Sequence, residues 1–127
     1  MTQLHIEAVG GRTAFWPGEA VELLVGWELA GEPEAVEIRA GWTTRGKGTQ
    51  DLKMVKAERI ESPKALDARR VPFALPSEPY SFSGKLVSLV WFLEVVALPS
   101  KEGTHIDIVI APGENEVMLH GYGKTSP

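Results

Sequence analysis

The sequence predicts an all-β fold, an antiparallel sandwich of about seven to eight strands. Apolar residues recur at every second position through most of the chain, which is the period of a strand with one buried face. Glycine and proline turn signals separate these alternating segments at spacings of about ten residues. No segment of ordinary helix length carries apolar residues at helical spacing, so strands account for the pattern.

Three segments in the first half of the chain alternate clearly. Residues 3–9 precede a turn at 15–19 that contains proline and glycine, the usual turn formers. Residues 20–29 and 35–44 are the next two predicted strands, and a polar, glycine-rich hairpin tip follows at 45–49. The alternating residues expected to face the core are Val21, Leu23, Val25, Trp27, Leu29, Val36, Ile38, Ala40 and Trp42.

Residues 51–61 are poorly patterned. As a strand, this segment would place Leu52, Met54, Lys56, Glu58 and Ile60 on one face. A short helix is the alternative, and the pattern leaves the choice between strand and helix open.

The second half contains the longest predicted strand. Residues 85–98 are apolar on both faces, which indicates a central strand covered on both sides or paired at an interface. Before it, residues 65–75 alternate but include Pro72, and a proline within a strand indicates a sheet edge or a bulge. Two further strands are predicted at 104–110 and 116–120, and residues 121–127 are predicted to be a frayed tail.

Composition restricts the classes of function. With 127 residues the chain is predicted to be one domain, 1–127. The net charge of −4 and the lack of a basic run argue against nucleic acid as a partner. Cysteine is absent, so the sequence predicts neither disulfides nor thiolate metal sites. No apolar stretch is long enough for a membrane span, and no secretory signal precedes the first strand, so we expect a cytoplasmic location.

Two blocks of sequence resemble a known family. Residues 16–21 read Trp-Pro-Gly-Glu-Ala-Val, and residues 73–76 read Phe-Ala-Leu-Pro. An aromatic–serine crossing at 79–86 then leads into a long strand with a central aromatic, Trp91. This order resembles an arrestin-type domain, an immunoglobulin-like sandwich also found in Vps26 and Spo0M. The resemblance implies a non-enzymatic adaptor or scaffold that binds proteins and uses no cofactor.

The chain departs from the family in two respects. Arrestins and Vps26 carry two such domains in tandem, whereas this chain has the length of one, so it resembles a single-domain, bacterial-type relative. The segment around His5 also lacks the pair of lysines near the first strand with which arrestins contact phosphorylated tails. Recognition of phosphopeptides is therefore not expected.

The residue patterns predict no catalytic, metal or cofactor site. His5 with Glu7, and His105 with Asp107, each place an imidazole and a carboxylate on one strand face. If the two strands were neighbours, they could form a zinc-like cluster, but we interpret both as polar solvent faces. The hairpin tip at 46–49 lacks the glycine spacing of a phosphate loop.

Six residues are the candidates for interaction. Trp16, at a turn, either anchors a partner, stacks on a sugar with the help of Tyr80, or closes the end of the sandwich. Arg45 at the hairpin tip either contacts an anionic group or is simply solvated. The remaining candidates are Lys47 on the same tip and the edge-strand residues Val71 and Phe73.

The sequence thus predicts a protein-binding domain that acts through a sheet edge or a sheet face. An edge strand offers unpaired backbone donors and acceptors to which a partner can add a strand, and the same chemistry permits a homodimer. A carbohydrate-binding sandwich module and a self-assembling structural domain are the alternatives. The partner and the binding surface are left open.

Overall fold

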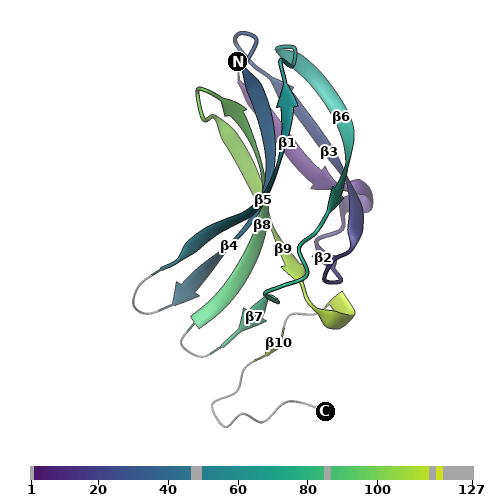
Figure 1. Cartoon of the computed structure of the whole chain (residues 1–127), viewed down its shortest axis with the longest axis vertical. Helices are drawn as coiled ribbons and strands as arrows, with labels where there is room; N and C mark the ends of the chain where they lie inside the picture. The colour runs from purple at the N-terminus through teal and green to yellow at the C-terminus, as the bar shows by residue number, and fades with distance from the viewer. Residues whose placement is uncertain (1, 47–49, 85–86, 115–116, 119–127) are drawn as a thin grey trace.

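The computed structural model describes residues 2–46, 50–84, 87–114 and 117–118, and it confirms the all-β prediction. Two sheets pack against each other around a shared apolar core, and the described residues form no α-helix (Figure 1). Seven of the described strands have six or more residues, in agreement with the predicted seven to eight. Two single-turn 3₁₀ segments, η1 (Val9–Gly11) and η2 (Pro112–Glu114), lie in connections.

The smaller sheet has three antiparallel strands. β3 (Ala20–Glu28) lies in the middle, with β1 (Gln3–Ala8) on one side and β6 (Leu66–Ala74) on the other. β6 is therefore a sheet edge, as Pro72 predicted.

The larger sheet is built around two 12-residue strands. β4 (Ala35–Gly46) pairs with β8 (Val87–Leu98) on one side and with β5 (Leu52–Glu61) on the other. The far side of β8 pairs with β7 (Phe82–Ser83) and then with β9 (Gly103–Ile110). Two short parallel pairings complete the sheet: β2 (Ala14–Phe15) with β9, and β10 (Val117–Met118) with β7.

Three of the four tryptophans belong to the core, as predicted. Trp27 and Trp91 are buried, and Trp42 is partly buried against the same cluster. Each buried indole N–H has a partner, because Trp27 donates to the carbonyl of Lys64 and Trp91 to that of Pro79, both at 2.7 Å. The indoles therefore fill the core without the cost of an unsatisfied buried donor.

β8 is central and covered on both faces, as its sequence predicted. Its inward residues include Trp91, Leu93 and Val95, which belong to the core. Its outward residues Phe92 and Val96 are also buried, although they lie outside the core cluster. On the outer face, Phe92 packs beside Met54 and against the His105 ring.

The segment predicted at 51–61 forms the strand β5 over Leu52–Glu61, so the helix alternative is wrong. The prediction that Leu52, Met54, Lys56, Glu58 and Ile60 share one face is also wrong, because a β-bulge interrupts the pairing opposite Ala40 and Gly41. Since a bulge adds one residue, it reverses the faces of every residue beyond it. Met54 lies with Phe92 over the outer side of Gly41, whereas Ile60 pairs with Val36 and packs on the core. The bulge is the physical reason for the poor pattern.

Several predictions fall outside the described residues. The frayed tail at 121–127 does so entirely, and of the strand predicted at 116–120 only Val117 and Met118 are described. The candidate residue Lys47 also lies outside the described residues.

Candidate functional site

The free edge of β6 is protected against pairing. Two backbone hydrogen bonds flank the pairing of β6 with β3: Leu29 N–H donates to Ala65 O at 2.8 Å, and Leu75 N–H donates to Glu19 O at 2.9 Å. Because alternate residues of an antiparallel strand bond to the same neighbour, the odd-numbered residues of β6 bond to β3. The even-numbered residues, Pro72 among them, therefore turn their backbones to the free edge. Proline offers no N–H there, and Lys56 Nζ already occupies the carbonyl of Ala74 at 2.8 Å.

The free edge of β5 is open over its second half. Ser62 N–H donates to Glu34 O at 3.1 Å, and the register between β5 and β4 is regular from there to the bulge. Because alternate residues of an antiparallel strand bond to the same neighbour, the even-numbered residues of β5 in this stretch bond to β4. Ala57, Arg59 and Glu61 consequently direct their N–H and C=O groups away from β4. No described strand pairs with this side of β5. The edge thus offers a row of backbone donors and acceptors.

The first half of β5 presents apolar side chains to solvent. Leu52 is 66% exposed, Met54 41% and Val55 39%. Beside Leu52 and Met54 the outer face is hollowed by a depression of about 270 Å³, and the Phe92 ring packs there edge-on against His105 with centroids 6.1 Å apart. A strand added to β5 would find apolar neighbours at one end of the edge.

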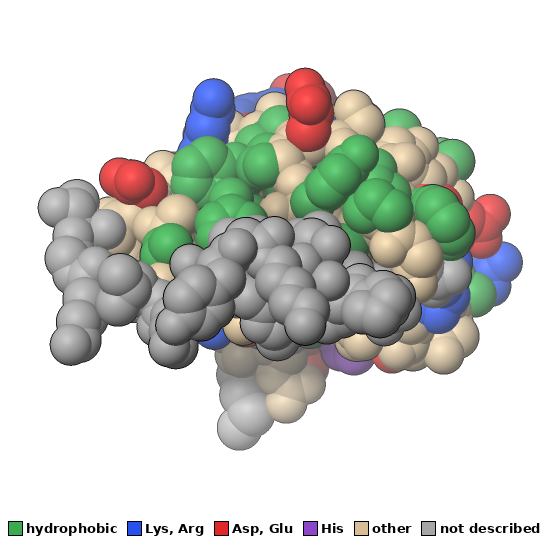
Figure 2. All heavy atoms as spheres, turned by 90° about the horizontal axis from the view of Figure 1, so that it is seen from below, with side chains coloured by type: hydrophobic (Ala, Val, Ile, Leu, Met, Phe, Trp, Pro, Cys, Tyr) green, Lys and Arg blue, Asp and Glu red, His purple; other side chains and the backbone are tan. Residues whose placement is uncertain are grey.

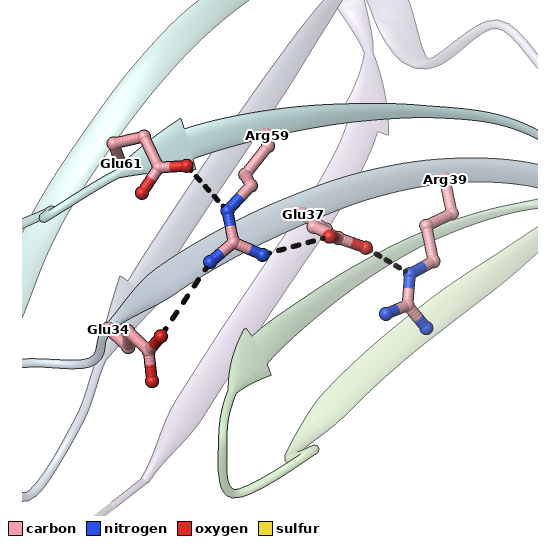
Figure 3. A network of polar contacts seen from close by, with 5 residues as sticks. All are labelled: Glu34, Glu37, Arg39, Arg59 and Glu61. Atoms are coloured by element: carbon pink, nitrogen blue, oxygen red, sulfur yellow. Dashed lines mark hydrogen bonds and ion pairs between the residues drawn. The ribbon is translucent and has the colours of Figure 1, made fainter.

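Ion pairs organise the outer face at the other end of β5 (Figure 3). The Arg59 guanidinium contacts Glu61 at 2.6 Å, Glu37 at 3.3 Å and Glu34 at 4.0 Å. Glu37 also binds Arg39 at 2.8 Å, and this hydrogen bond holds the pKa of Glu37 below its ordinary value against the opposing effect of desolvation. The network ties Glu61 and Arg59 of β5 to Glu34 and to Glu37 of β4, while no described strand pairs with the free edge of β5.

A second polar contact on this face is incomplete. Glu94 Oε1 is buried and lies 3.5 Å from the Arg39 guanidinium, yet it accepts no hydrogen bond in the described structure. Arg45, one of the predicted interaction residues, pairs with Asp107 at 3.1 Å and borders the same depression.

Trp16 is 51% exposed and therefore does not close the end of the sandwich. Two hydrogen bonds hold its turn rigidly. Trp16 N–H donates to Glu19 Oε1 at 3.0 Å, and Glu19 N–H donates to Trp16 O at 3.1 Å. Arg12 holds the same Glu19 carboxylate at 2.6 Å and lies 4.7 Å from the centroid of the Phe15 ring. The exposed indole is thus carried on a preorganised turn.

Tyr80, the other aromatic candidate, is 44% exposed. The chain segments of Trp16 and Tyr80 both attach to the end of β9, because Ala111 N–H donates to Phe15 O and Ser81 N–H to Ile110 O. The end of the molecule where β2, β7 and β10 lie exposes hydrophobic side chains between charged ones when it is seen from below (Figure 2).

The two candidates on β6 face inward. Val71 packs on the core, and Phe73 is only 2% exposed, beneath the Lys56 ammonium at 4.5 Å from its ring centroid. Their side chains serve the interior of the sandwich. The alternating pattern with Pro72 pointed to this edge and not to β5. The apolar residues Leu52, Met54 and Val55 in an otherwise polar segment were the signal for β5 in the sequence.

The two histidine–carboxylate pairs lie on opposite outer faces. His5 and Glu7, 3.3 Å apart, lie outside the smaller sheet, whereas His105 and Asp107 lie outside the larger one. The described residues contain no group of three side chains suited to hold a metal ion. Within the same residues, no helix has the length and hydropathy of a membrane span.

Comparison with known proteins identifies the fold. No family model matches this chain, and no curated protein matches it. Among solved structures, the chain is similar to Spo0M, the sporulation control protein of Bacillus subtilis, with a TM-score of 0.61 and 14% sequence identity. The similarity covers 87% of this chain and 49% of the Spo0M chain, so this chain spans about half the length of that protein.

The fold is therefore an arrestin-like β-sandwich, as the sequence resemblance predicted.

Proposed function

We propose that this domain is a non-enzymatic, protein-binding adaptor that takes up an extended segment of a partner protein at the free edge of β5. The observation that carries the proposal is the open row of backbone groups at Ala57, Arg59 and Glu61. Strand addition is a common way in which sheet proteins bind peptides, because the backbone provides affinity and alternate side chains provide specificity.

The edge has features that support both affinity and selectivity. Each added backbone hydrogen bond contributes about 1 kcal/mol net. Leu52, Met54 and Val55 offer exposed apolar neighbours at one end, while Arg59 and Glu61 offer opposite charges at the other. A suitable partner strand is therefore apolar at one end and carries both signs of charge at the other.

The comparison between the two edges supports β5 over β6. At β6, Pro72 lacks the donor that a partner strand needs and Lys56 occupies the last carbonyl. The second half of β5 has no proline and a regular ladder. Its bulge lies near Met54, so strand addition is expected mainly over residues 56–61.

Ala57→Pro tests the proposal. This change removes an N–H directed to the free edge and leaves the hydrogen bonds to β4 in place. Arg70→Pro is the matched control, because Arg70 occupies an equivalent free-edge position on β6 and its ion pair with Glu22 is exposed. Thermal melting should show both variants folded before binding is compared.

The probe is a displayed library of random ten-residue peptides selected on the wild-type domain. We expect binders that lose at least about tenfold in affinity with Ala57→Pro and retain it with Arg70→Pro. Binding should slow amide exchange at Ala57, Arg59 and Glu61. Peptides that bind both variants equally, or that protect amides elsewhere, would overturn the proposal.

The exposed aromatic pair favours a second candidate, carbohydrate binding. Trp16 on its rigid turn and the exposed Tyr80 could stack on sugar rings. Titration of tryptophan fluorescence against a panel of glycans tests this candidate, with Trp16→Ala as the control. A response that persists in Trp16→Ala, or no response in the wild type, eliminates it.

A further inference from the structure

The outer face of the smaller sheet is hollowed across its middle. Two adjoining depressions, of about 630 and 380 Å³, share His5, Gly26 and Ala68. These three residues are direct neighbours across β1, β3 and β6 in the strand register. The depressions therefore form one groove that runs across all three strands, and we call it the Gly26 groove.

The fold does not require a glycine at position 26. Gly26 does not have a positive φ, and a Cβ atom there would lie 3.7 Å from Asp67 O and 3.8 Å from Ala68 Cβ, which is ordinary contact. Glycine inside a strand reduces stability, and it often marks a place where a ligand or another backbone approaches closely. The missing side chain at Gly26 deepens the groove and serves no packing need.

The walls combine apolar and acidic groups. On one side of the central row lie Glu28 and Leu66, which is 69% exposed, and on the other side lie Glu7 and Leu24. Glu28 forms no ion pair with a described residue, and the one ion-pair partner of Glu7 among the described residues is the imidazole of His5. Both walls thus present a carboxylate that forms no ion pair with a lysine or arginine of the described residues.

The basic residues beside the groove are already paired. Arg69 binds Asp67 at 3.0 Å and Arg70 binds Glu22 at 3.1 Å. The groove therefore keeps an acidic character beside its leucines. A complementary occupant carries positive charge next to apolar side chains.

We propose that the Gly26 groove binds an extended segment of a partner protein in which lysine or arginine alternates with apolar residues. The three strands span about 10 Å, which is the length of about three extended residues. The groove lies outside the smaller sheet, whereas the β5 edge belongs to the larger one, so the domain has room for two partners at once. That arrangement is a scaffold, and it is independent of strand addition at β5.

Gly26→Leu tests the groove by filling it. The probe is a displayed library of random twelve-residue peptides, selected on the wild-type domain and counter-selected on Gly26→Leu. We expect selected peptides enriched in lysine and arginine, with affinity at least about tenfold lower for Gly26→Leu than for the wild type. Ala57→Pro should leave their affinity unchanged, which separates this site from the β5 edge.

Two further variants, which each remove one charge from the walls, test the groove even if Gly26→Leu folds poorly. Glu7→Gln and Glu28→Gln alter exposed wall positions, and each should weaken binding about threefold to tenfold, with smaller losses at high salt. Recovery of no peptide whose binding depends on Gly26, or affinity unaffected by both glutamate variants, would overturn the proposal. Binders without an excess of basic residues would also overturn it.

Discussion

The ammonium group of Lys56 lies 4.5 Å from the centroid of the Phe73 ring and so joins the edges of the two sheets. Lys56 belongs to β5 and Phe73 to β6, and the same ammonium donates to Ala74 O at 2.8 Å. The contact covers a core aromatic and occupies a carbonyl at the free edge of β6.

Lys56→Ala should therefore destabilise the domain. The loss of the cation–π contact and of the hydrogen bond should lower the free energy of unfolding by about 1–2 kcal/mol. Urea denaturation measures the change. Lys53→Ala is the control, because Lys53 is an exposed lysine on the same strand and no contact of its side chain is described. Equal effects of the two substitutions would contradict the role assigned to Lys56.

Two glycines in adjacent layers should respond oppositely to alanine. At Gly41 a Cβ atom would lie 2.6 Å from Lys53 O and 2.8 Å from Phe92 Cζ, so Gly41→Ala should cost about 1–3 kcal/mol of stability. Gly26→Ala meets no such contact and should raise stability by about 0.4–1 kcal/mol. Thermal and urea denaturation of both variants check the pair. Destabilisation by Gly26→Ala would mean that the fold itself needs this glycine.

Stability should fall in acid partly through Glu19. Its hydrogen bond with Arg12 lowers the pKa of Glu19 below the ordinary 4.5 in the folded protein, although desolvation opposes this shift. The stability contributed by the carboxylate is therefore present above pH 4.5 and is lost as the pH falls through the lower, folded-state pKa. Glu19→Gln should flatten the dependence of the urea midpoint on pH in this window.

The control for Glu19 is Glu32→Gln, since Glu32 is exposed and has no ion pair among the described residues. The fluorescence of Trp16 should report the same transition, because its backbone N–H binds the Glu19 carboxylate. A Glu19→Gln variant with an unchanged pH profile would contradict the assignment.

Hydrogen exchange should alternate along the second half of β5. The amides of Glu58 and Ile60 bond to β4 and should exchange slowly, whereas those of Ala57, Arg59 and Glu61 should exchange at least about tenfold faster. Exchange followed by NMR measures this at each residue. Slow exchange at all five amides, lost on dilution, would show that a second copy of the chain already pairs with the edge.

Much of the architecture could be predicted because alternation is a local property. Residues such as Val21, Leu23 and Val25 reveal a half-buried strand without reference to the rest of the chain. Pro72 likewise indicated an edge through its own missing N–H. The segment around Met54 could not be predicted in this way, because its bulge shifts the faces and the shift depends on how β5 pairs with β4.

The candidate sites could not be predicted from any single segment, because each site depends on which strands lie side by side. The sequence by itself determined the strands other than β5, the tryptophan core and the order of blocks that indicates the arrestin-like fold. Only the tertiary structure decided that Phe73 faces inward, that β5 is the open edge, and that Gly26 lies at the floor of a groove. The physical reason is that an edge or a groove forms when strands distant in sequence pair through hydrogen bonds. The alternation of apolar and polar side chains, in contrast, can be recognised within each strand alone.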